Sequence, residues 1–303
     1  MSATKAAPAA RPAAPSVRPA KPARRPANGR PRRARPAPNR VAIGIDFGGS
    51  GIKGALVDLG SGTLLTERYR VKTPKPATPQ ASIDVMRQLL DDIGRERPFG
   101  DDTPIGIGLP AVVVDGITAT AVNIDEKWLG YLAEEGISEG LGRPVSVLND
   151  ADAAGVGEMR YGAGLGHPGT VVVITLGTGI GSALFRDGHL LPNTELGHIE
   201  VRGKDAEERA SAAARERRKL SWSDYAGEVD EYLHKLDMLV WADLMIIGGG
   251  ISKEADRFIE RLTVRPTVVA AALRNNAGIV GAAAVASERS ERRVGGQALA
   301  EPG

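Results

Sequence analysis

The chain has 303 residues, of which 42% are apolar and 4% aromatic, and it contains no cysteine. That length allows two domains of ordinary size with a hydrophobic core in each. The lack of cysteine excludes disulfides, thiolate metal sites and cysteine nucleophiles, and no apolar run approaches the ~20 residues that span a bilayer. The sequence predicts a soluble globular protein in which oxygen or imidazole groups hold any metal.

Residues 1–40 differ from the rest of the chain in composition and charge. They hold two Lys, nine Arg, nine Pro and no acidic residue, so they carry +11 while the whole chain carries +2, which leaves −9 for the remainder. Because such a segment cannot build a core, we expect it to be disordered. A solvated extension is the simplest interpretation. A nucleic-acid arm remains an alternative, and the many prolines argue against a transit peptide.

From Val41 onward, short apolar runs alternate with turns and helical patterns. The first three expected strands form an antiparallel meander, and Thr78 followed by Pro79 predicts the start of the first helix. In chain order we expect strands at 41–47, 52–59 and 64–72, a helix from 78, strands at 105–109 and 145–148, a helix at 151–160, two strands within 170–185, helices at 205–219 and 223–239, a strand at 243–247, a helix at 254–262, a strand at 267–270 and a helix at 276–287.

Two stretches of the chain resemble each other. The run Ile45 to Leu56 (IDFGGSGIKGAL) aligns with Ile174 to Leu184 (ITLGTGIGSAL) when one gap is allowed. Both predict a strand, a glycine-rich turn and a second strand. The simplest architecture is two related α/β domains that each present such a hairpin to a shared cleft. A chance likeness between hairpins of a glycine-rich protein is the alternative.

The first hairpin has the composition of a phosphate cradle. Its glycine and polar residues are Asp46, Gly48, Gly49, Ser50, Gly51 and Lys53. Glycines leave backbone N–H groups free to point at phosphate oxygens, although the loop joins two strands and is therefore not a Walker A loop. Asp46 suits a Mg²⁺ ion that bridges phosphates, or it is an ordinary turn-capping aspartate.

Two other glycine clusters offer the same kind of surface. Thr175, Gly177, Thr178 and Gly179 belong to the second hairpin, and Gly248, Gly249 and Gly250 follow the strand expected at 243–247. The last cluster carries little weight alone, because many strands end in glycine.

Polar residues with catalytic or sugar-binding character occur at two further places. Asn149 and Asp150 lie where an apolar strand gives way to a helix. A carboxylate there can accept the proton of an attacking hydroxyl, but Asp and Asn are also preferred helix N-caps, and spacing alone leaves both interpretations open. Glu195 and His198 lie in an expected loop and suit sugar hydroxyls.

These motifs resemble those of the ROK family of sugar kinases and repressors, within the actin-like superfamily. The resemblance covers about Val41 to Ser287, and the runs AVNIDEKW (121–128), PNTELGH (192–198) and LRNNAGIVG (273–281) look like the branch of that family that uses polyphosphate. It implies a two-domain actin-like α/β fold of the hexokinase/ROK type with an interdomain cleft. The implied divisions are a tail at 1–40, domains at 41–149 and 150–274, a helix at 276–287 that packs back on the first domain, and a disordered tail at 288–303.

The resemblance also implies roles. Asp150 is the expected general base for phosphorylation of the 6-hydroxyl of glucose, with polyphosphate and possibly ATP as donor. The expected sugar contacts are Asn123, Asn149, Asp150, Glu195 and His198, and the three glycine clusters with Asp46, Ser50, Lys53, Thr175 and Thr178 are expected at the phosphates. Asp46 is the candidate ligand of Mg²⁺. Most ROK members have a cysteine-rich zinc site after the Gly-His element, and its absence removes zinc here.

Several alternatives remain at this stage. A glucokinase or glucomannokinase that uses only ATP is the main one, because both donors present the same terminal phosphoryl group. A ROK repressor would need a helix-turn-helix segment, which the proline-rich start cannot form, and an inert sugar-binding scaffold would not need Asp150 and both phosphate loops. We also expect a cytoplasmic homodimer without membrane or specific nucleic-acid partners.

Overall fold

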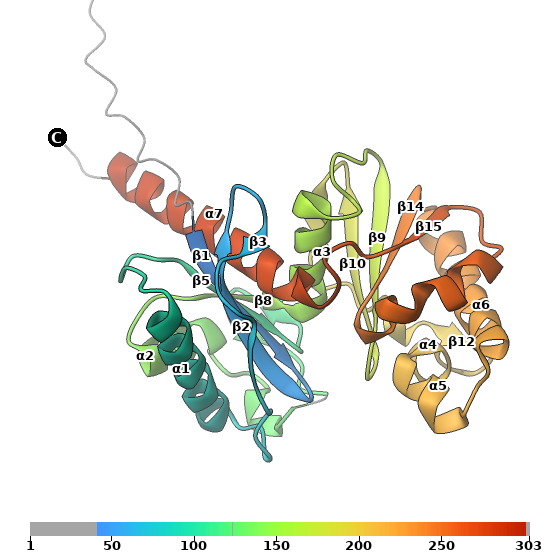
Figure 1. Ribbon diagram of the computed structural model, residues 1–303, viewed down its shortest axis with the longest axis horizontal. Coiled ribbons are helices and arrows are strands. Elements are labelled where there is room, and N and C mark those ends of the chain that lie inside the picture. Colours follow the sequence, from blue (N-terminus) through green and yellow to red (C-terminus); the bar gives the residue numbers. More distant parts are fainter. Residues whose placement is uncertain (1–40, 123, 301–303) are drawn as a thin grey trace, which may run out of the picture. The chain divides into compact units, whose positions relative to one another are not determined.

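The computed structural model describes residues 41–122 and 124–300. The segment expected to be disordered at 1–40, the predicted sugar contact Asn123 and residues 301–303 lie outside the described residues. Within the described part, two large β-sheets with helices on their faces form the framework (Figure 1). No helix in this part of the chain is long and apolar enough to cross a membrane.

The first sheet has six strands in the order β3-β2-β1-β5-β8, with β4 also paired to β2. The strands are β1 (Val41–Gly48), β2 (Gly51–Asp58), β3 (Thr63–Leu64), β4 (Tyr69–Val71), β5 (Ile105–Leu109) and β8 (Ser146–Asn149). β1 and β2 are antiparallel, whereas β1, β5 and β8 run parallel. The carboxyl ends of β1 and β8 therefore meet at the same edge of the sheet, where Asp46 and Asn149 lie.

The second sheet repeats this arrangement with the order β11-β10-β9-β14-β15. Its strands are β9 (Thr170–Leu176), β10 (Ile180–Arg186), β11 (His189–Leu191), β14 (Leu244–Gly248) and β15 (Thr267–Ala270). β9 and β10 are antiparallel, and β9, β14 and β15 run parallel. Each sheet thus begins with an antiparallel hairpin and adds two parallel strands beside the first strand of that hairpin.

The pairing registers explain the gap in the internal alignment. Phe47 pairs with Ile52 across the first turn, and Leu176 pairs with Ile180 across the second. The second turn is therefore one residue shorter. The predicted pair of glycine-rich hairpins is confirmed, and the identical strand order makes a chance likeness a poor explanation.

Helices cover both faces of each sheet. On the first sheet, α1 (Pro79–Glu96) and α2 (Ala133–Leu141) pack on one face and α7 (Ala277–Ala300) on the other (Figure 1). On the second sheet, α4 (Ala206–Ala210) and α6 (Trp222–Val240) share a core with one face, while α3 (Asp150–Tyr161) and α7 share a core with the other. The Thr78 side chain caps α1 by accepting the Ala81 N–H, as its sequence predicts.

Helices α3 and α7 approach each other unusually closely because glycines lie at their contacts. A Cβ atom at Gly281 would lie 1.7 Å from the Ala153 carbonyl oxygen, and one at Gly157 would lie 2.4 Å from that of Ala277. α7 also reaches the first sheet, where a Cβ at Gly44 would lie 1.8 Å from the Ile279 carbonyl oxygen. These glycines let α7 pack closely against α3, which carries Asp150, and also against β1. The predicted boundary between domains at 149 and 150 remains a prediction.

Two expected elements are interrupted by polar side chains. The strand expected at 64–72 is two short strands, β3 and β4. The Thr66 hydroxyl accepts the Leu56 N–H at 3.1 Å, which interrupts the backbone pairing with β2 between these two strands. The helix expected at 205–219 breaks at Ser211 into α4 and α5 (Ala212–Arg218). Ser211 is extended there and its hydroxyl caps the second helix.

Two other expectations are wrong in type or length. The helix expected at 254–262 is a pair of 3₁₀ segments, η3 (Gly250–Arg257) and η4 (Ile259–Arg261), with a kink at Glu254. The disordered tail expected from 288 is helical as far as Ala300. Its polar residues make contacts that hold the helix: Arg289 donates to the Val147 carbonyl at 2.9 Å, and Arg293 pairs with Glu134.

The remaining regular elements were not expected from the sequence. They are the helix α2 and the strand β11 described above, the strands β6 (Val113–Val114), β7 (Ile117–Thr118), β12 (Glu200–Val201) and β13 (Lys204–Asp205), and the 3₁₀ turns η1 (Glu126–Trp128), η2 (Leu196–His198) and η5 (Arg274–Asn276). Most are too short to leave a periodic pattern.

Candidate active site

A pocket of about 100 Å³ lies where β1, α3, β9, β14 and the start of α7 meet. It is lined by Asp46, Lys53, Asp150, Ala151, Ala154, Glu158, Val173, Thr175, Gly248, Gly249, Ala271, Arg274, Asn275, Ala277 and Gly278. The structure thus brings together Asp150 and members of all three predicted phosphate clusters. The turn residues Gly48 to Gly51 and Gly177 to Gly179, the residue Gly250, and the sugar candidates Asn149, Glu195 and His198 do not line it.

The start of α3 holds one residue that caps the helix and a second that lines the pocket. The Asn149 side chain accepts the N–H groups of Ala151 and Asp152 at 2.8 and 3.0 Å, and it donates to the Ala111 carbonyl at 3.1 Å. Asn149 is therefore the N-cap of α3, and its side-chain contacts are directed at the protein. Because the cap is already supplied, the Asp150 carboxylate is available for chemistry in the pocket.

The protonation of Asp150 is set by its surroundings. Burial, together with the nearby carboxylates of Asp46 and Glu195, raises the pKa of Asp150 to about 7, although the Ala151 N–H opposes the shift. A carboxylate with a pKa near neutrality can hold and release a proton at physiological pH, which suits a general base. This perturbation lies in a pocket with candidate phosphate-binding groups, so it points to function and not only to burial.

The first glycine turn carries more positive charge than its sequence suggests. Lys53 donates to Asp46 at 2.8 Å, so these two predicted residues form an ion pair at the pocket wall. The Arg70 guanidinium lies beside the turn and donates to the carbonyl and hydroxyl of Ser50 at 3.2 and 3.3 Å. A Cβ at Gly51 would lie 2.5 Å from the Arg70 Nε atom, so a larger residue there would displace this side chain.

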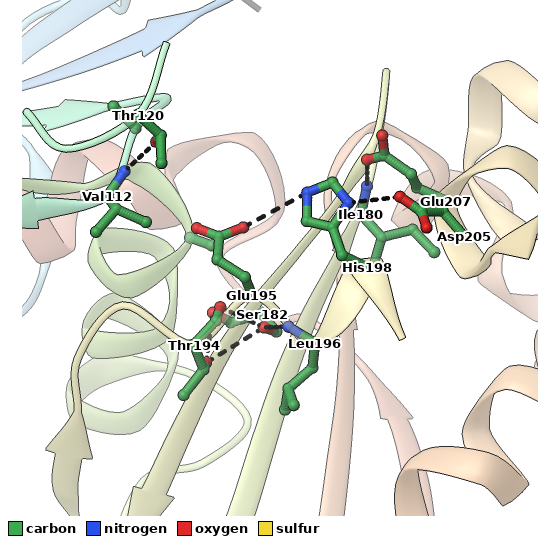
Figure 2. Close-up of polar contacts among 12 residues, drawn as sticks. Val112, Thr120, Ile180, Ser182, Thr194, Glu195, Leu196, His198, Asp205 and Glu207 are labelled. Carbon is green, nitrogen blue, oxygen red and sulfur yellow. Dashed lines mark hydrogen bonds and ion pairs between the residues drawn. The ribbon is translucent and has the colours of Figure 1, made fainter. Parts of the chain in front are cut away.

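The second glycine turn is occupied by an acidic side chain. Glu207 accepts the N–H of Ile180 at 3.3 Å, and a Cβ at Gly179 would lie 2.4 Å from the Glu207 carboxylate (Figure 2). The backbone amide that follows Gly179 is therefore engaged in this structure. An incoming phosphate would have to displace Glu207 to use that amide.

The third cluster closes the pocket from the side of β14. Gly248 ends that strand opposite Thr175, and Gly249 has a φ of +78° with its Cα against Leu176. A Cβ at Gly249 would lie 2.6 Å from the Leu176 carbonyl oxygen. The conformation and the contact both require glycine, which brings the backbone of this segment to the pocket surface.

The predicted sugar residues form a chain of polar groups on a separate loop. The Glu195 carboxylate lies 3.9 Å from His198 Nε2, and His198 Nδ1 lies 2.9 Å from Asp205 (Figure 2). The hydrogen bond with Asp205 is the main reason that the pKa of His198 is raised, and burial raises the pKa of Glu195. Both Glu195 and His198 remain exposed enough to meet a ligand.

The loop that carries these groups is tied to β10 and to α3. Ser182 donates to the Thr194 carbonyl at 2.6 Å and accepts the Leu196 N–H at 3.0 Å (Figure 2). One residue earlier, the Asn193 N–H donates to Asp152 at 2.8 Å. The loop that carries Glu195 is therefore tied to the helix turn that presents Asp150, and the charges of Glu195 and Asp150 interact.

The sequence does not predict five charged residues of the site: Arg70, Glu158, Asp205, Glu207 and Arg274. None belongs to a glycine motif, and each reaches the site through tertiary packing. Of these residues, Arg274 alone lies in one of the runs that resemble the ROK family, LRNNAGIVG. Spacing gave no signal for Asp205, because its contact with His198 depends on the hairpin of β12 and β13.

Among the described residues, no group of three or more His, Asp or Glu side chains is arranged to hold a metal ion. Mg²⁺ in phosphoryl transfer is usually bound through one or two carboxylates, with phosphate and water as the other ligands. Asp46 at the pocket wall fits that pattern, provided that its pairing with Lys53 loosens.

Known proteins share this architecture. A polyphosphate glucokinase from Mycobacterium tuberculosis is 47% identical over 245 residues, which cover 80% of this chain and 90% of that protein. The crystal structure of an inorganic polyphosphate/ATP-glucomannokinase from Arthrobacter sp. strain KM has 48% identity and a TM-score of 0.81, covering 83% of this chain and 100% of that one. A ROK family glucokinase from Streptomyces griseus, in complex with glucose and AMPPNP, has 26% identity and a TM-score of 0.71, covering 82% and 99%.

The two sheets of one topology and the likeness to these structures define an actin-like sugar kinase fold. The ROK family model matches residues 42–219. The chain belongs to the ROK family.

Proposed function

We propose that this protein phosphorylates glucose at its 6-hydroxyl, with inorganic polyphosphate as donor, to give glucose 6-phosphate. The observation that carries the proposal is the placement of Asp150, with a pKa of about 7, in a pocket shared with Asp46, Lys53 and the Gly248–Gly249 backbone. The relatives that are 47–48% identical are named polyphosphate glucokinase and inorganic polyphosphate/ATP-glucomannokinase, which supports the same donor and acceptor here.

In the reaction, the 6-hydroxyl oxygen attacks the terminal phosphorus of the donor in line with the bridging oxygen. The new P–O bond forms as the anhydride bond breaks, and Asp150 takes the hydroxyl proton. The leaving group is the donor shortened by one phosphate. Asn149 contributes by capping α3, which fixes where the Asp150 carboxylate lies.

The sugar is proposed to lie against the loop of Glu195 and His198. His198 is held by Asp205 through Nδ1, so its Nε2 atom and the Glu195 carboxylate are the groups left to meet hydroxyls. Asn123 is a further proposed contact, whereas the Asn149 side chain caps α3 and positions Asp150. The exposed side chains of Glu195 and His198 suit the hydroxyl groups of a hexose, which both donate and accept hydrogen bonds.

The donor is proposed to lie along the glycine clusters, with Lys53, Ser50, Thr175, Thr178 and the nearby Arg70 as further groups. Phosphoryl transfer depends mainly on positioning and on neutralising charge, which backbone amides and cations supply. A bound Mg²⁺ would neutralise charge on the transferring phosphates, and Asp46 is its proposed ligand. We also expect a cytoplasmic homodimer.

ATP is a proposed second donor, because the Arthrobacter relative is named for both donors and presents the same fold. Mannose is a further proposed acceptor for the same reason. A coupled assay that detects only glucose 6-phosphate tests the function directly. The purified protein should form that product from glucose and polyphosphate, and a product detectable only as another sugar phosphate would contradict the proposed position of transfer.

A further inference from the structure

Arg274 lines the active-site pocket in a backbone conformation that an arginine rarely adopts. Its φ is +53°, in the left-handed region where glycine is the favoured residue. A non-glycine residue held in this region costs free energy, and such positions cluster at functional sites. A role of the Arg274 side chain in the pocket would explain why arginine occupies this strained position.

The charges of the residues that line the pocket indicate this role of Arg274. Among the described residues that line it, the cations are Lys53 and Arg274, and the acids are Asp46, Asp150 and Glu158. Lys53 is paired with Asp46, whereas no acidic side chain of the described part lies within ion-pair distance of Arg274. Arg274 is exposed and lines the pocket, and its guanidinium has no acidic partner among the described residues.

A buried carboxylate holds the segment that aims Arg274. Glu158 lies on α3, two turns after Asp150, and is 0% exposed. Its two oxygens accept the N–H groups of Ala272 and Leu273 at 3.0 and 2.8 Å, and one of them also accepts the Ala163 N–H at 2.9 Å. The residue that follows Leu273 is therefore fixed to the same helix that carries the general base.

We propose that Arg274 binds non-bridging oxygens of the donor's phosphate chain, and that Glu158 positions it by clamping the backbone at Ala272 and Leu273. This inference rests on the proposed function. The guanidinium suits the task, because its planar fork donates two parallel hydrogen bonds to phosphate oxygens. Polyphosphate and ATP share the terminal phosphates, so the experiment compares both.

The central test is the variant Arg274→Gly. Glycine takes the left-handed conformation without steric cost, so the melting temperature should stay within about 2 °C of the parent or rise. The KM for the donor should rise roughly tenfold or more, the scale of one charge-assisted hydrogen bond, while the KM for glucose changes little. Arg274→Lys keeps the charge but loses the fork, and it should fall between the two.

Arg292→Ala is the matched control, because it removes the same charge from an exposed site on α7 whose ion-pair partner in the described part of the chain is Glu288 of the same helix. Its donor KM should not change. A rise for polyphosphate alone identifies polyphosphate as the source of the bound phosphates, and a rise for both donors identifies their shared terminal phosphates. An unchanged KM for both donors in Arg274→Gly overturns the inference, as does a lowered melting temperature with unchanged donor KM.

The positioning role of Glu158 is tested by a double-mutant cycle. Glu158→Gln should raise the donor KM in the parent but not further in Arg274→Gly, because Glu158 acts through Arg274. Equal rises in both backgrounds would contradict the positioning role. If Glu158→Gln does not fold, the Arg274 variants still decide the main point.

Equilibrium binding of tripolyphosphate separates this inference from the proposed function. The parent protein should bind it more tightly than Arg274→Gly, whether or not the catalytic assay is active. An active parent enzyme with equal binding in the variant would overturn the role of Arg274 and leave the function intact. A parent without kinase activity would overturn the function instead.

Discussion

Asn149 and Asp150 stand next to each other where β8 gives way to α3, and their side chains have different surroundings. The strand-to-helix junction at Asn149 and Asp150 predicts either a cap or a base, and the proposed function gives each residue one of these tasks. Asn149 satisfies the helix N-terminus, and Asp150 points into the pocket. Spacing could not decide between them, because the answer depends on which side chain the Ala111 carbonyl and the helix amides engage.

Replacing Asp150 with Asn should lower kcat by about 10² or more, the usual effect of losing a positioned base. The fold should persist, because the cap belongs to Asn149. Turnover of glucose and circular dichroism of the variant provide the check. Near-normal turnover would remove Asp150 from the mechanism.

The pH dependence follows from the same carboxylate. A general base works only when it is ionised, and the pKa of Asp150 in the free protein is raised to about 7. The value of kcat/KM for glucose should therefore rise with pH up to about 7 and level off above it, falling roughly tenfold per unit on the acid side. A profile that is flat from about pH 5.5 to 8.5 would contradict this assignment.

At the scale of elements, the sequence predicts most strands and the long helices but misses how polar side chains interrupt them. β15 appears at the predicted residues, because a short β-branched run between turns has few alternatives. Thr66 and Ser211 interrupt their segments because their hydroxyls accept backbone N–H groups, and periodicity does not register such bonds. The sequence does not predict the helix after 287, because its arginines have the composition of a solvated segment. Their contacts with the Val147 carbonyl and with Glu134 depend on the tertiary fold.

The contact of α3 with α7 can be tested by adding one methyl group. Gly281→Ala should destabilise the protein by about 3 kcal/mol or more, because the new Cβ would lie 1.7 Å from the Ala153 carbonyl oxygen. Gly227→Ala is the control, since Gly227 is an exposed residue inside α6 with open space around it. That change should stabilise by about 0.5–1 kcal/mol. Urea unfolding of both variants measures the difference, and similar midpoints would contradict the close packing.

For the molecule as a whole, the internal repeat carries most of the predictive information. Two hairpins with a one-residue offset indicate two related sheets, and both sheets indeed have one strand order. The groups that complete the site could not be found this way. Arg70, Glu207 and Arg274 come from segments outside the repeated hairpins and reach them only through packing.

The basic segment 1–40 lies outside the described residues, so its contribution is predicted from composition. Deleting residues 2–39 should leave the melting temperature and the turnover with a short donor unchanged, because a segment without apolar periodicity adds no core. Thermal unfolding of the shortened protein is the measurement. A large drop in melting temperature would show that the segment packs on the rest of the chain.

The central claim concerns the donor, and the charge of the molecule makes it testable. Residues from Val41 onward carry −9, so a polyanion approaches favourably only where cations such as Arg70 and Arg274 reverse the local sign. A longer anion engages more of these cations and loses more to screening. The decisive measurement is kcat/KM for glucose 6-phosphate formation with polyphosphate and with ATP, at low and high ionic strength. We predict a higher value with polyphosphate and a difference that narrows as salt rises, whereas a higher value with ATP at every salt concentration would contradict the assignment.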